Sequence, residues 1–333
     1  DVQAFEPEAA WSVENLVADA GAPALDFWRE AYPDLQTTLY RPDTDLAALV
    51  QDADLVIVHE WNDPGLVAAI GQLRRTARFT LLFHDTHHRA VSEPEAMRRY
   101  ELDEYDGVLA FGATLAEVYR RWGWAGRVHV WHEAADTAWF HPPATEVPRH
   151  GAVWIGNWGD GERTAELEDF LLRPTRQAGL PLDIYGVRYP DEARALLARY
   201  GVAYLGWLPN HRAPAVFARH RLTVHVPRRF YSTVLPGIPT IRVFEALACG
   251  IPLLSAPWDD AENLFTPGQD FLFASTGDAM LAAMRDLLHD TARRDAMVAH
   301  GLATIRARHT CGHRADELLA IVARLRHPNL AST

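Results

Sequence analysis

Residues 240–255 read Thr-Ile-Arg-Val-Phe-Glu-Ala-Leu-Ala-Cys-Gly-Ile-Pro-Leu-Leu-Ser, and this stretch decides the fold. Its one acid, Glu245, lies in a short helical segment that Gly250 ends and Pro252 separates from a strand. The helix follows Pro236-Gly237-Ile238-Pro239, so its first free backbone N–H groups and positive dipole end face whatever that turn binds. Phosphate suits such a position. Glu245 lies about one turn further along, within reach of an attached sugar.

The stretch alone also allows a simpler interpretation, with Glu245 as a solvated helix carboxylate and Gly250 only as a helix end. The residues after it favour a functional interpretation. Residues 256–274 read Ala-Pro-Trp-Asp-Asp-Ala-Glu-Asn-Leu-Phe-Thr-Pro-Gly-Gln-Asp-Phe-Leu-Phe-Ala. This order of loop, short helix and closing strand, after the motif at 240–255, resembles the donor domain of glycosyltransferases with two Rossmann-like domains, the GT-B type. The resemblance implies that Glu245 binds the ribose hydroxyls of a nucleotide-sugar donor.

The composition describes a globular chain with room for two domains. Of its 333 residues, 48% are hydrophobic and 23% are charged. Apolar runs such as Leu55–Val58 are far shorter than the roughly 20 residues of a membrane-spanning helix. The formal net charge of −12 argues against a protein that grips nucleic acid backbones. Cys249 and Cys311 form neither a disulfide framework nor a metal-binding knuckle, so we expect a cytoplasmic protein.

The chain has no lysine, so all 32 of its Lys and Arg residues are arginine. Schiff-base chemistry and the P-loop motif, both of which need lysine, are therefore excluded. Any bound phosphate has to be held by arginine or by backbone N–H groups.

Short β-branched or leucine-rich runs alternate with amphipathic stretches, which is the pattern of parallel sheets covered by helices. We expect an α/β fold of GT-B architecture, with two doubly wound, Rossmann-like domains facing a cleft. The expected parts are an acceptor-side domain at 1–143, a donor domain at 144–305, and a helix at 306–333 that packs back toward the first domain. Residues 1–6 look like a second strand, so we expect that a preceding βα unit of about 30 residues is missing from this sequence.

Polar residues follow two expected strands of the first domain. His84 and Asp85 end one run, and His59-Glu60-Trp61-Asn62-Asp63 ends another. His84, Asp85 and Glu60 are our catalytic candidates, with Glu60 as a base or as the group that orients an acceptor hydroxyl. Two alternatives stay open: a metal site within 83–89, and a mere helix cap at Asn62-Asp63-Pro64. The stretch at 132–136 is interpreted as a structural hinge.

The second domain supplies the donor-site candidates. Arg228, Arg229 and Arg242 are natural partners for a diphosphate, whose charge increases as the sugar leaves. The turn at Gly156-Asn157 can bring a diphosphate or a sugar close to the backbone, although a Gly-rich turn alone is weak evidence. The remaining candidates flank the expected diphosphate or base: Tyr185, Trp207, Leu208, Gly237, Thr240 and Ile241. For Trp207, a place in the core is the alternative.

Over most of residues 50–325 the chain resembles spore-maturation CgeB-type proteins of the glycosyltransferase group 1 family. The motifs that carry this are His84-Asp85, Gly156-Asn157, Phe-Glu-Ala-Leu-Ala-Cys-Gly at 244–250 and Arg-His-Thr-Cys-Gly-His-Arg at 308–314. Retaining members carry a second Glu eight positions before the helix Glu. Here Gly237 stands at that place, so contact with the donor sugar has to come from backbone or elsewhere.

The resemblance implies a hexosyltransferase that uses a UDP-, dTDP- or GDP-sugar and an unidentified acceptor, with no metal in the donor site and with retention of configuration. If the reaction is retaining, the leaving phosphate can take the acceptor proton, so no protein nucleophile is needed. Two rivals remain. A nucleotide-sugar epimerase on the same fold would use the carboxylates at 60, 63, 85 and 133 as acid and base. A non-catalytic binder would hold the donor without releasing nucleoside diphosphate.

Overall fold

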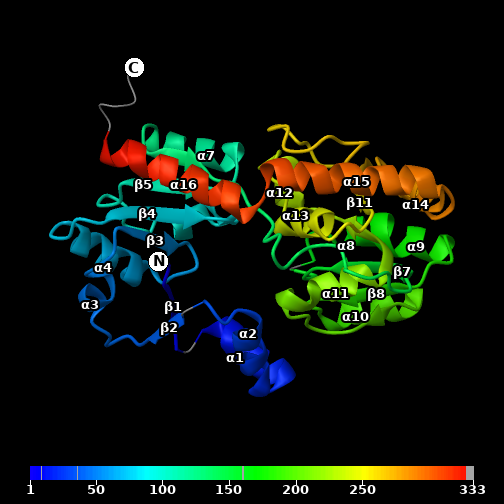
Figure 1. The fold of residues 1–333 in the computed structure, drawn as a ribbon, viewed down its shortest axis with the longest axis horizontal. Coiled ribbons are helices and arrows are strands. Elements are labelled where there is room, and N and C mark those ends of the chain that lie inside the picture. The colour runs from blue at the N-terminus through cyan, green and yellow to red at the C-terminus, as the bar shows by residue number, and fades with distance from the viewer. Residues whose placement is uncertain (9, 36, 160, 328–333) are drawn as a thin grey trace. The chain divides into compact units, whose positions relative to one another are not determined.

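The computed structural model describes residues 1–8, 10–35, 37–159 and 161–327 (Figure 1). It divides into two compact units, residues 1–52 with 209–211 and residues 53–208 with 212–333. All strand pairs in the described residues are parallel, as the alternating sequence pattern predicted. None of the described helices combines the length and apolar content needed to cross a bilayer.

The first unit contains a two-stranded sheet, in which Ala4 lies opposite Thr37. Its elements are β1 (Ala4–Pro7), α1 (Trp11–Ala20), α2 (Pro23–Ala31), β2 (Thr37–Tyr40) and α3 (Leu46–Val50). The strand expected at the start of the chain is therefore present as β1. Asp45 begins α3 in the usual way for an N-cap, because its carboxylate accepts hydrogen bonds from two backbone N–H groups of the first turn.

The second unit contains two sheets, each with its own helices, which we call the first lobe and the second lobe. The first lobe has a four-stranded sheet in the order β3-β4-β5-β6. Its elements are β3 (Leu55–His59), α4 (Pro64–Arg74), β4 (Thr80–Asp85), α5 (Arg89–Ser92), α6 (Pro94–Met97), β5 (Gly107–Ala110), α7 (Ala113–Tyr119), the π-helical turn η1 (Arg120–Trp124) and β6 (Val128–Val130).

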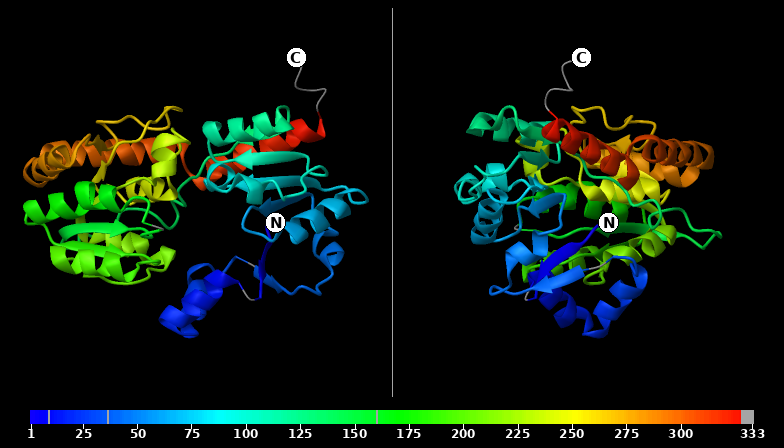
Figure 2. Two further views of the ribbon diagram at one scale, coloured as in Figure 1. Left: turned by 180° about the vertical axis from the view of Figure 1, so that it is seen from behind. Right: turned by 60° about the vertical axis from the view of Figure 1, so that its left-hand side comes forward.

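Helix α16 (Cys311–Arg326) also belongs to the first lobe, although it comes from the far end of the chain. It runs beside β4 and β5 in every view (Figures 1 and 2). Its Ile321 and Val322 share one apolar cluster with Leu82 and Leu109 of those strands. The sheet of the first lobe is therefore covered on this face by residues that are remote in sequence.

The second lobe has a six-stranded sheet in the order β12-β11-β10-β7-β8-β9. Its strands are β7 (His150–Ile155), β8 (Leu182–Tyr185), β9 (Ala203–Tyr204), β10 (His220–His225), β11 (Leu253–Ser255) and β12 (Leu272–Phe273). Its helices are α8 (Thr164–Leu167), η2 (Glu168–Leu172), α9 (Arg173–Gln177), α10 (Asp191–Tyr200), α11 (Ala213–Ala218), α12 (Arg229–Thr233), α13 (Ile241–Ala248), α14 (Gly277–His289) and α15 (Thr291–Arg308), and the short turn η3 (Asn210–Arg212) contains residues of the first unit.

Both faces of this second sheet are buried. Along β7, Ala152 and Trp154 belong to one apolar cluster and Val153 and Ile155 to another, as expected for a strand with helices on both sides. The strand order changes direction between β7 and β10, and doubly wound sheets bind ligands at the carboxyl ends of the strands at such a point.

Candidate functional site

Glu245 lies in the middle of α13 and is only 2% exposed. Its Oε2 is 2.5 Å from Nη1 of Arg242, one turn earlier on the same helix. A buried carboxylate needs such a charged or hydrogen-bonding partner. The interpretation of Glu245 as a solvated helix carboxylate is therefore wrong, and Arg242, predicted to bind a diphosphate, is engaged with Glu245.

The turn before α13 contacts the first lobe. Gly237 has φ +91, and a Cβ built on it would lie 3.0 Å from Cβ of Ala261. The carbonyl of Pro236 accepts a 3.0 Å hydrogen bond from Oγ1 of Thr114, which lies in the first turn of α7. Gly237 is thus required by the shape of this turn, which explains why a larger residue is absent here.

Thr240 is the N-cap of α13, and Ile241 is its first residue. The Thr240 side chain makes no capping hydrogen bond, so it leaves the first N–H groups of α13 without a side-chain cap. Both residues are half-buried. The N–H of Val243 donates to the carbonyl of Thr240 at 3.0 Å, and a phosphate at the N–H groups of Ile241 and Arg242 stays a prediction.

Glu262 connects the two lobes as well. Its Oε2 accepts a 2.8 Å hydrogen bond from the backbone N–H of Ala113 at the start of α7. Its Oε1 lies 2.8 Å from Nε2 of His132. The hinge stretch at 132–136 thus has a contact that fixes its geometry next to the second lobe.

Two buried carboxylates lie at the carboxyl ends of β3 and β4. Glu60 Oε2 is 2.9 Å from Nη1 of Arg89, while Glu60 Oε1 has no hydrogen-bond partner among the described residues. Asp85 accepts hydrogen bonds from the backbone N–H of His87 at 2.9 Å and from the hydroxyl of Tyr119 at 2.7 Å.

Burial, and next the charge of Asp85, raise the pKa of Glu60 to about 8. Burial raises the pKa of Asp85 to about 6. Carboxyl groups that titrate in this range can donate or accept a proton near neutral pH, which ordinary carboxylates cannot do well. The geometry thus makes Glu60 and Asp85 a chemically competent pair.

His84 does not lie with Asp85, because successive residues of a strand point to opposite faces of the sheet. Its ring is 4.9 Å from that of Trp131 and 5.3 Å from that of His59, measured between centroids. Burial lowers the pKa of His84 to about 3. The predicted His84-Asp85 pair is therefore split, with His84 as a neutral ring packed against Trp131.

The alternatives left open for these segments are resolved by local contacts. Asp63 caps α4, since its Oδ1 accepts a 2.8 Å hydrogen bond from the N–H of Gly65. Within 83–89, the described side chains do not bring three metal-ligand atoms together. The cap is confirmed, and the metal site at 83–89 is not supported.

Arg228 contacts the first lobe from the loop after β10. Its Nη1 is 2.8 Å from Nε2 of His88, whose Nδ1 is 2.9 Å from Oγ of Ser92. Arginine only donates, so Nε2 of His88 accepts and Nδ1 carries the proton. The same imidazole stacks on Phe230, with ring centroids 4.4 Å apart.

Three arginines act on His87, the residue next to His88. Burial first, and then the charges of His88, Arg228, Arg89 and Arg188, lower the pKa of His87 to about 3. These arginines come from the segments after β10, β4 and β8, so positive charge from both lobes converges at one place. Such a cluster suits a diphosphate.

Arg229, the neighbour of Arg228, points elsewhere. Its guanidinium lies 2.9 Å from Glu166, and its side chain is half-exposed. Arg228 thus contacts His88 of the first lobe and Arg229 pairs with Glu166 of its own lobe, and diphosphate binding by either arginine stays a prediction.

The Gly-rich turn at 156–159 lies against Arg228. A Cβ on Gly159 would be 2.7 Å from Nη2 of Arg228, so a side chain at this position would push the guanidinium away. The side-chain Oδ1 of Asn157 accepts a hydrogen bond from the backbone N–H of Val187 at 3.2 Å. The backbone carbonyl oxygen of Asn157 accepts a hydrogen bond from Nη2 of Arg163 at 2.5 Å. Gly156 and Asn157 thus hold the backbone near the arginines.

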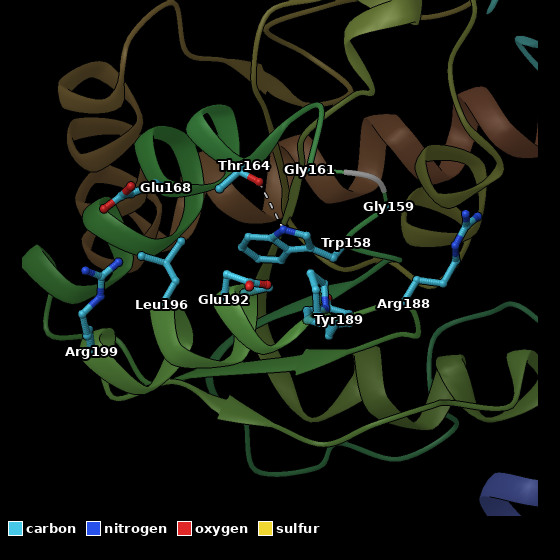
Figure 3. A pocket seen from close by; sticks show the side chains of 12 residues that line it. Trp158, Gly159, Gly161, Thr164, Glu168, Arg188, Tyr189, Glu192, Leu196 and Arg199 are labelled. Atoms are coloured by element: carbon cyan, nitrogen blue, oxygen red, sulfur yellow. Dashed lines mark hydrogen bonds between the residues drawn. The ribbon is translucent and has the colours of Figure 1, made fainter.

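A pocket of about 830 Å³ opens beside this turn (Figure 3). The Trp158 indole donates to Oγ1 of Thr164 at 3.2 Å and lies between the pocket's two ends, with Arg188 at one end and Arg199 at the other. The pocket therefore extends the arginine cluster along the second lobe.

Two further predicted donor residues have packing roles. Tyr185 and Leu208 pack against the apolar cluster that contains Val153 and Phe244. Trp207 is half-buried, and both alternatives for it stay predictions.

The structure resembles several solved sugar-transferring proteins at low sequence identity. Sucrose-phosphate synthase from Thermosynechococcus elongatus aligns with a TM-score of 0.66 and 17% identity, over 89% of this chain and 85% of its own. HepE from Anabaena, in complex with UDP and glucose, aligns with a TM-score of 0.68 and 15% identity, over 96% of this chain and 98% of HepE. BGT from phage T4, in complex with UDP and Mn²⁺, aligns with a TM-score of 0.59 and 13% identity, over 96% of this chain and 97% of BGT.

The chain has the GT-B fold. The predicted fold class is confirmed. A family model described as glycosyl transferase-like matches residues 163–320, which include α13 and most of the second lobe. A search of curated proteins found no match. Together the family match and the GT-B fold support an enzyme that transfers a sugar.

The candidate site includes residues that were not among the predicted donor or catalytic residues of a transferase. Burial, and next the charge of Glu245, raise the pKa of Glu133, which the sequence named only as an acid or base of an epimerase, to about 7. His88 and Arg89 lie within the stretch Phe-His-Asp-Thr-His-His-Arg that the sequence singled out, but the prediction chose its first half. Arg188 is marked in the structure by its φ of +62. This strained backbone conformation could not be predicted, because no sequence pattern reveals it.

Proposed function

We propose that this protein is a glycosyltransferase that moves a hexose from a nucleoside-diphosphate sugar to an acceptor. The observation that carries the proposal is the convergence of Arg89, Arg188 and Arg228 on His87, next to buried Glu60 and Asp85. This cluster combines positive charge for a diphosphate with two carboxyl groups at the carboxyl ends of neighbouring strands of the first-lobe sheet.

We propose UDP as the nucleotide, because HepE, which this chain resembles, is described in complex with UDP and glucose. In this proposal Arg228 and the N–H groups at the start of α13 bind the diphosphate. Glu245 binds the ribose hydroxyls while Arg242 holds its carboxylate in place. The CgeB-type subgroup stays part of the proposal on the resemblance of the motifs alone, and a cytoplasmic location stays part of it on the two cysteines.

We propose that the donor needs no divalent ion. The three arginines supply positive charge where a metal would otherwise bridge the phosphates. The T4 protein BGT is described with UDP and Mn²⁺, so the two possibilities are separated by EDTA: transfer that persists in EDTA supports the proposal, and transfer that EDTA abolishes and Mn²⁺ restores contradicts it.

We further propose retention of configuration. Glu60 and Asp85 are fully buried, and both oxygens of Asp85 already accept hydrogen bonds. Neither is exposed as a nucleophile toward a sugar, which agrees with a leaving phosphate that takes the acceptor proton. The anomeric configuration of the product, measured by NMR, tests this directly.

One observation favours a second candidate, a nucleotide-sugar epimerase. The pKa values of Glu60, Asp85 and Glu133 are raised to about 8, 6 and 7, which suits proton abstraction and return. An epimerase converts its nucleotide sugar when no acceptor is present and releases no free sugar as its main product. A transferase without acceptor releases nucleoside diphosphate slowly, with water in place of the acceptor.

The first experiment is a thermal-shift and nucleotide-release screen of UDP-, dTDP- and GDP-sugars, with and without EDTA. The variants are Glu245→Gln and, as a matched control in the same lobe, Glu166→Gln, whose carboxylate pairs with surface Arg229. We expect stabilisation by one donor in wild type and control, and its loss in Glu245→Gln. Folded wild type that is stabilised by no nucleotide would contradict the donor site and favour the binder of other glycans.

A further inference from the structure

A cluster of side chains of the types that bind metals lies at the amino ends of the second-lobe strands, away from the arginines at their carboxyl ends. His150 and His220 are the first residues of β7 and β10 and lie directly opposite each other in the register of that strand pair. Asp183 lies near the start of β8, on the other side of β7. Since the strands are parallel, their amino ends lie together, and a six-residue strand such as β7 separates them from the carboxyl ends by about 17 Å. The cluster is therefore separate from the arginines and from the sugar-transfer chemistry.

The spacing of the three side chains fits one metal ion. One ligand atom from each residue lies within 4.8 Å of the others. Asp183 Oδ2 is 3.5 Å from Nε2 of His150 and 3.1 Å from Nε2 of His220. In a tetrahedral zinc site with bonds of about 2.0–2.1 Å, neighbouring ligand atoms are about 3.3 Å apart. The two distances lie on either side of this value.

The hydrogen bonding of His220 gives an independent reason to expect a cation between His220 and Asp183. Its Nδ1 is 2.7 Å from the carbonyl oxygen of Val216, which can only accept, so Nδ1 carries a proton. In the neutral ring, Nε2 then has a lone pair and faces a carboxylate oxygen of Asp183, so two acceptors meet. A cation between them removes this conflict. An imidazole whose outer N–H is bound to a backbone carbonyl is also the usual arrangement of a zinc ligand.

We propose that His150, Asp183 and His220 bind a divalent transition-metal ion, for which zinc is the natural probe. Two imidazoles and one carboxylate are the ligand types that zinc prefers. The His220 side chain is 3% exposed and the His150 side chain 57%, so the site has a fixed inner ligand and an open side where water completes the coordination. The ion joins the starts of β7, β8 and β10 and stabilises the second lobe.

Without a metal, the same geometry requires a doubly protonated His220 in an ion pair with Asp183, and this is the competing explanation. The test uses the full chain in a Cys311→Ser background, since Cys311 is an exposed thiol and thiolates are zinc ligands in general. After dialysis against EDTA, zinc is titrated by competition with a chromophoric chelator. Cobalt(II) absorption then reports tetrahedral coordination.

We expect one saturable zinc site per chain and a zinc-dependent rise in melting temperature. His150→Gln, which changes an exposed side chain, should weaken the affinity at least roughly tenfold and abolish the cobalt spectrum, with Asp183→Asn as a second variant. His300→Gln is the matched control, because His300 meets Asp270 at 2.6 Å without a third metal ligand in the described part of the chain. It should bind zinc like the parent.

UDP release should be unchanged in His150→Gln, because the cluster is remote from the donor site. Two results overturn the proposal: no saturable binding by the folded parent, or binding that is equally strong in His150→Gln and Asp183→Asn. Either one leaves the imidazolium–carboxylate pair as the explanation of the geometry.

Discussion

Arg228 and His88 lie 140 residues apart in the sequence, and Nη1 of Arg228 donates to Nε2 of His88 at 2.8 Å. This hydrogen bond joins the loop after β10 of the second lobe to the segment after β4 of the first. A ligand that binds Arg228 therefore also acts on His88 and on its neighbours His87 and Arg89. Through this contact the proposed donor site is joined to the segment of the first lobe that follows buried Asp85.

Arg228→Ala should weaken UDP binding by about 10- to 100-fold, because a hydrogen bond to a charged group contributes about 1.5–3 kcal/mol. Arg229→Ala is the matched control. Its guanidinium pairs with surface Glu166, so its loss should change the affinity by less than about threefold. Isothermal titration of UDP measures both. Equal losses in the two variants would show that Arg228 has no special place in the donor site.

Arg242→Met should strongly destabilise the fold. It removes the cation that lies 2.5 Å from buried Glu245, and breaking a buried ion pair in this way costs about 3–5 kcal/mol. The double variant with Glu245→Gln should recover part of that loss, since no buried charge then remains. Glu166→Gln, which breaks an exposed pair, should cost about 0–1 kcal/mol. Urea unfolding tests this order, and a double variant less stable than Arg242→Met would contradict it.

Glu60→Gln should become more stable relative to wild type as the pH rises. Burial raises the pKa of Glu60 from 4.5 to about 8, so between these values the folded protein holds a proton that the unfolded chain has released. The stabilising contribution of that proton is complete below about pH 4.5 and is lost as the pH rises through about 8.

Glutamine does not titrate, so the free energy of unfolding of the variant lacks this dependence. The measurement is urea unfolding of both proteins at about pH 5 and about pH 8. A difference in stability between them that stays constant across this range would mean that Glu60 is ionised in the folded protein.

Gly237→Ala should cost more than Gly268→Ala. Both glycines have positive φ, +91 and +87, so both variants lose about 1 kcal/mol or more to backbone strain. A Cβ on Gly268 meets nothing within 4 Å, whereas a Cβ on Gly237 meets Cβ of Ala261 at 3.0 Å. Thermal unfolding compares them. Equal shifts would mean that the turn before α13 adapts without cost.

The sequence predicted much of the sheet structure, because buried parallel strands are apolar runs bounded by turn residues. The apolar run at Leu55–Val58 is part of the strand Leu55–His59. The strand His220–His225 begins and ends at a polar histidine, which does not look like a buried strand residue. Fold class followed from the motif at 240–255, whose helix does end before Gly250 at φ +65.

The choice of site residues stays a prediction. Glu245, Arg228 and Glu60 were chosen because they stand at strand ends or in the motif helix, and the structure shows that Arg228 contacts the other lobe through His88. The ion pairs of the arginines were not predictable, because they depend on side-chain directions that the sequence does not show. The examples are Arg242 with Glu245 and Arg229 with Glu166. His88 and Glu133 gain their roles from contacts with residues more than a hundred positions away.

The metal cluster escaped prediction for a different reason. His150, Asp183 and His220 are separated by more than 30 residues each, and no short motif joins them. They also lie at the amino ends of strands, whereas catalytic side chains were sought at the carboxyl ends.

The packing of α16 on the first lobe bears on how the protein is made. Leu82 and Leu109 complete their apolar cluster only with Ile321 and Val322. A ribosome adds about 5–20 residues per second, so the roughly 200 residues between them take about 10–40 s to synthesise. During that time the sheet of the first lobe presents an uncovered apolar face, which is a binding surface for chaperones.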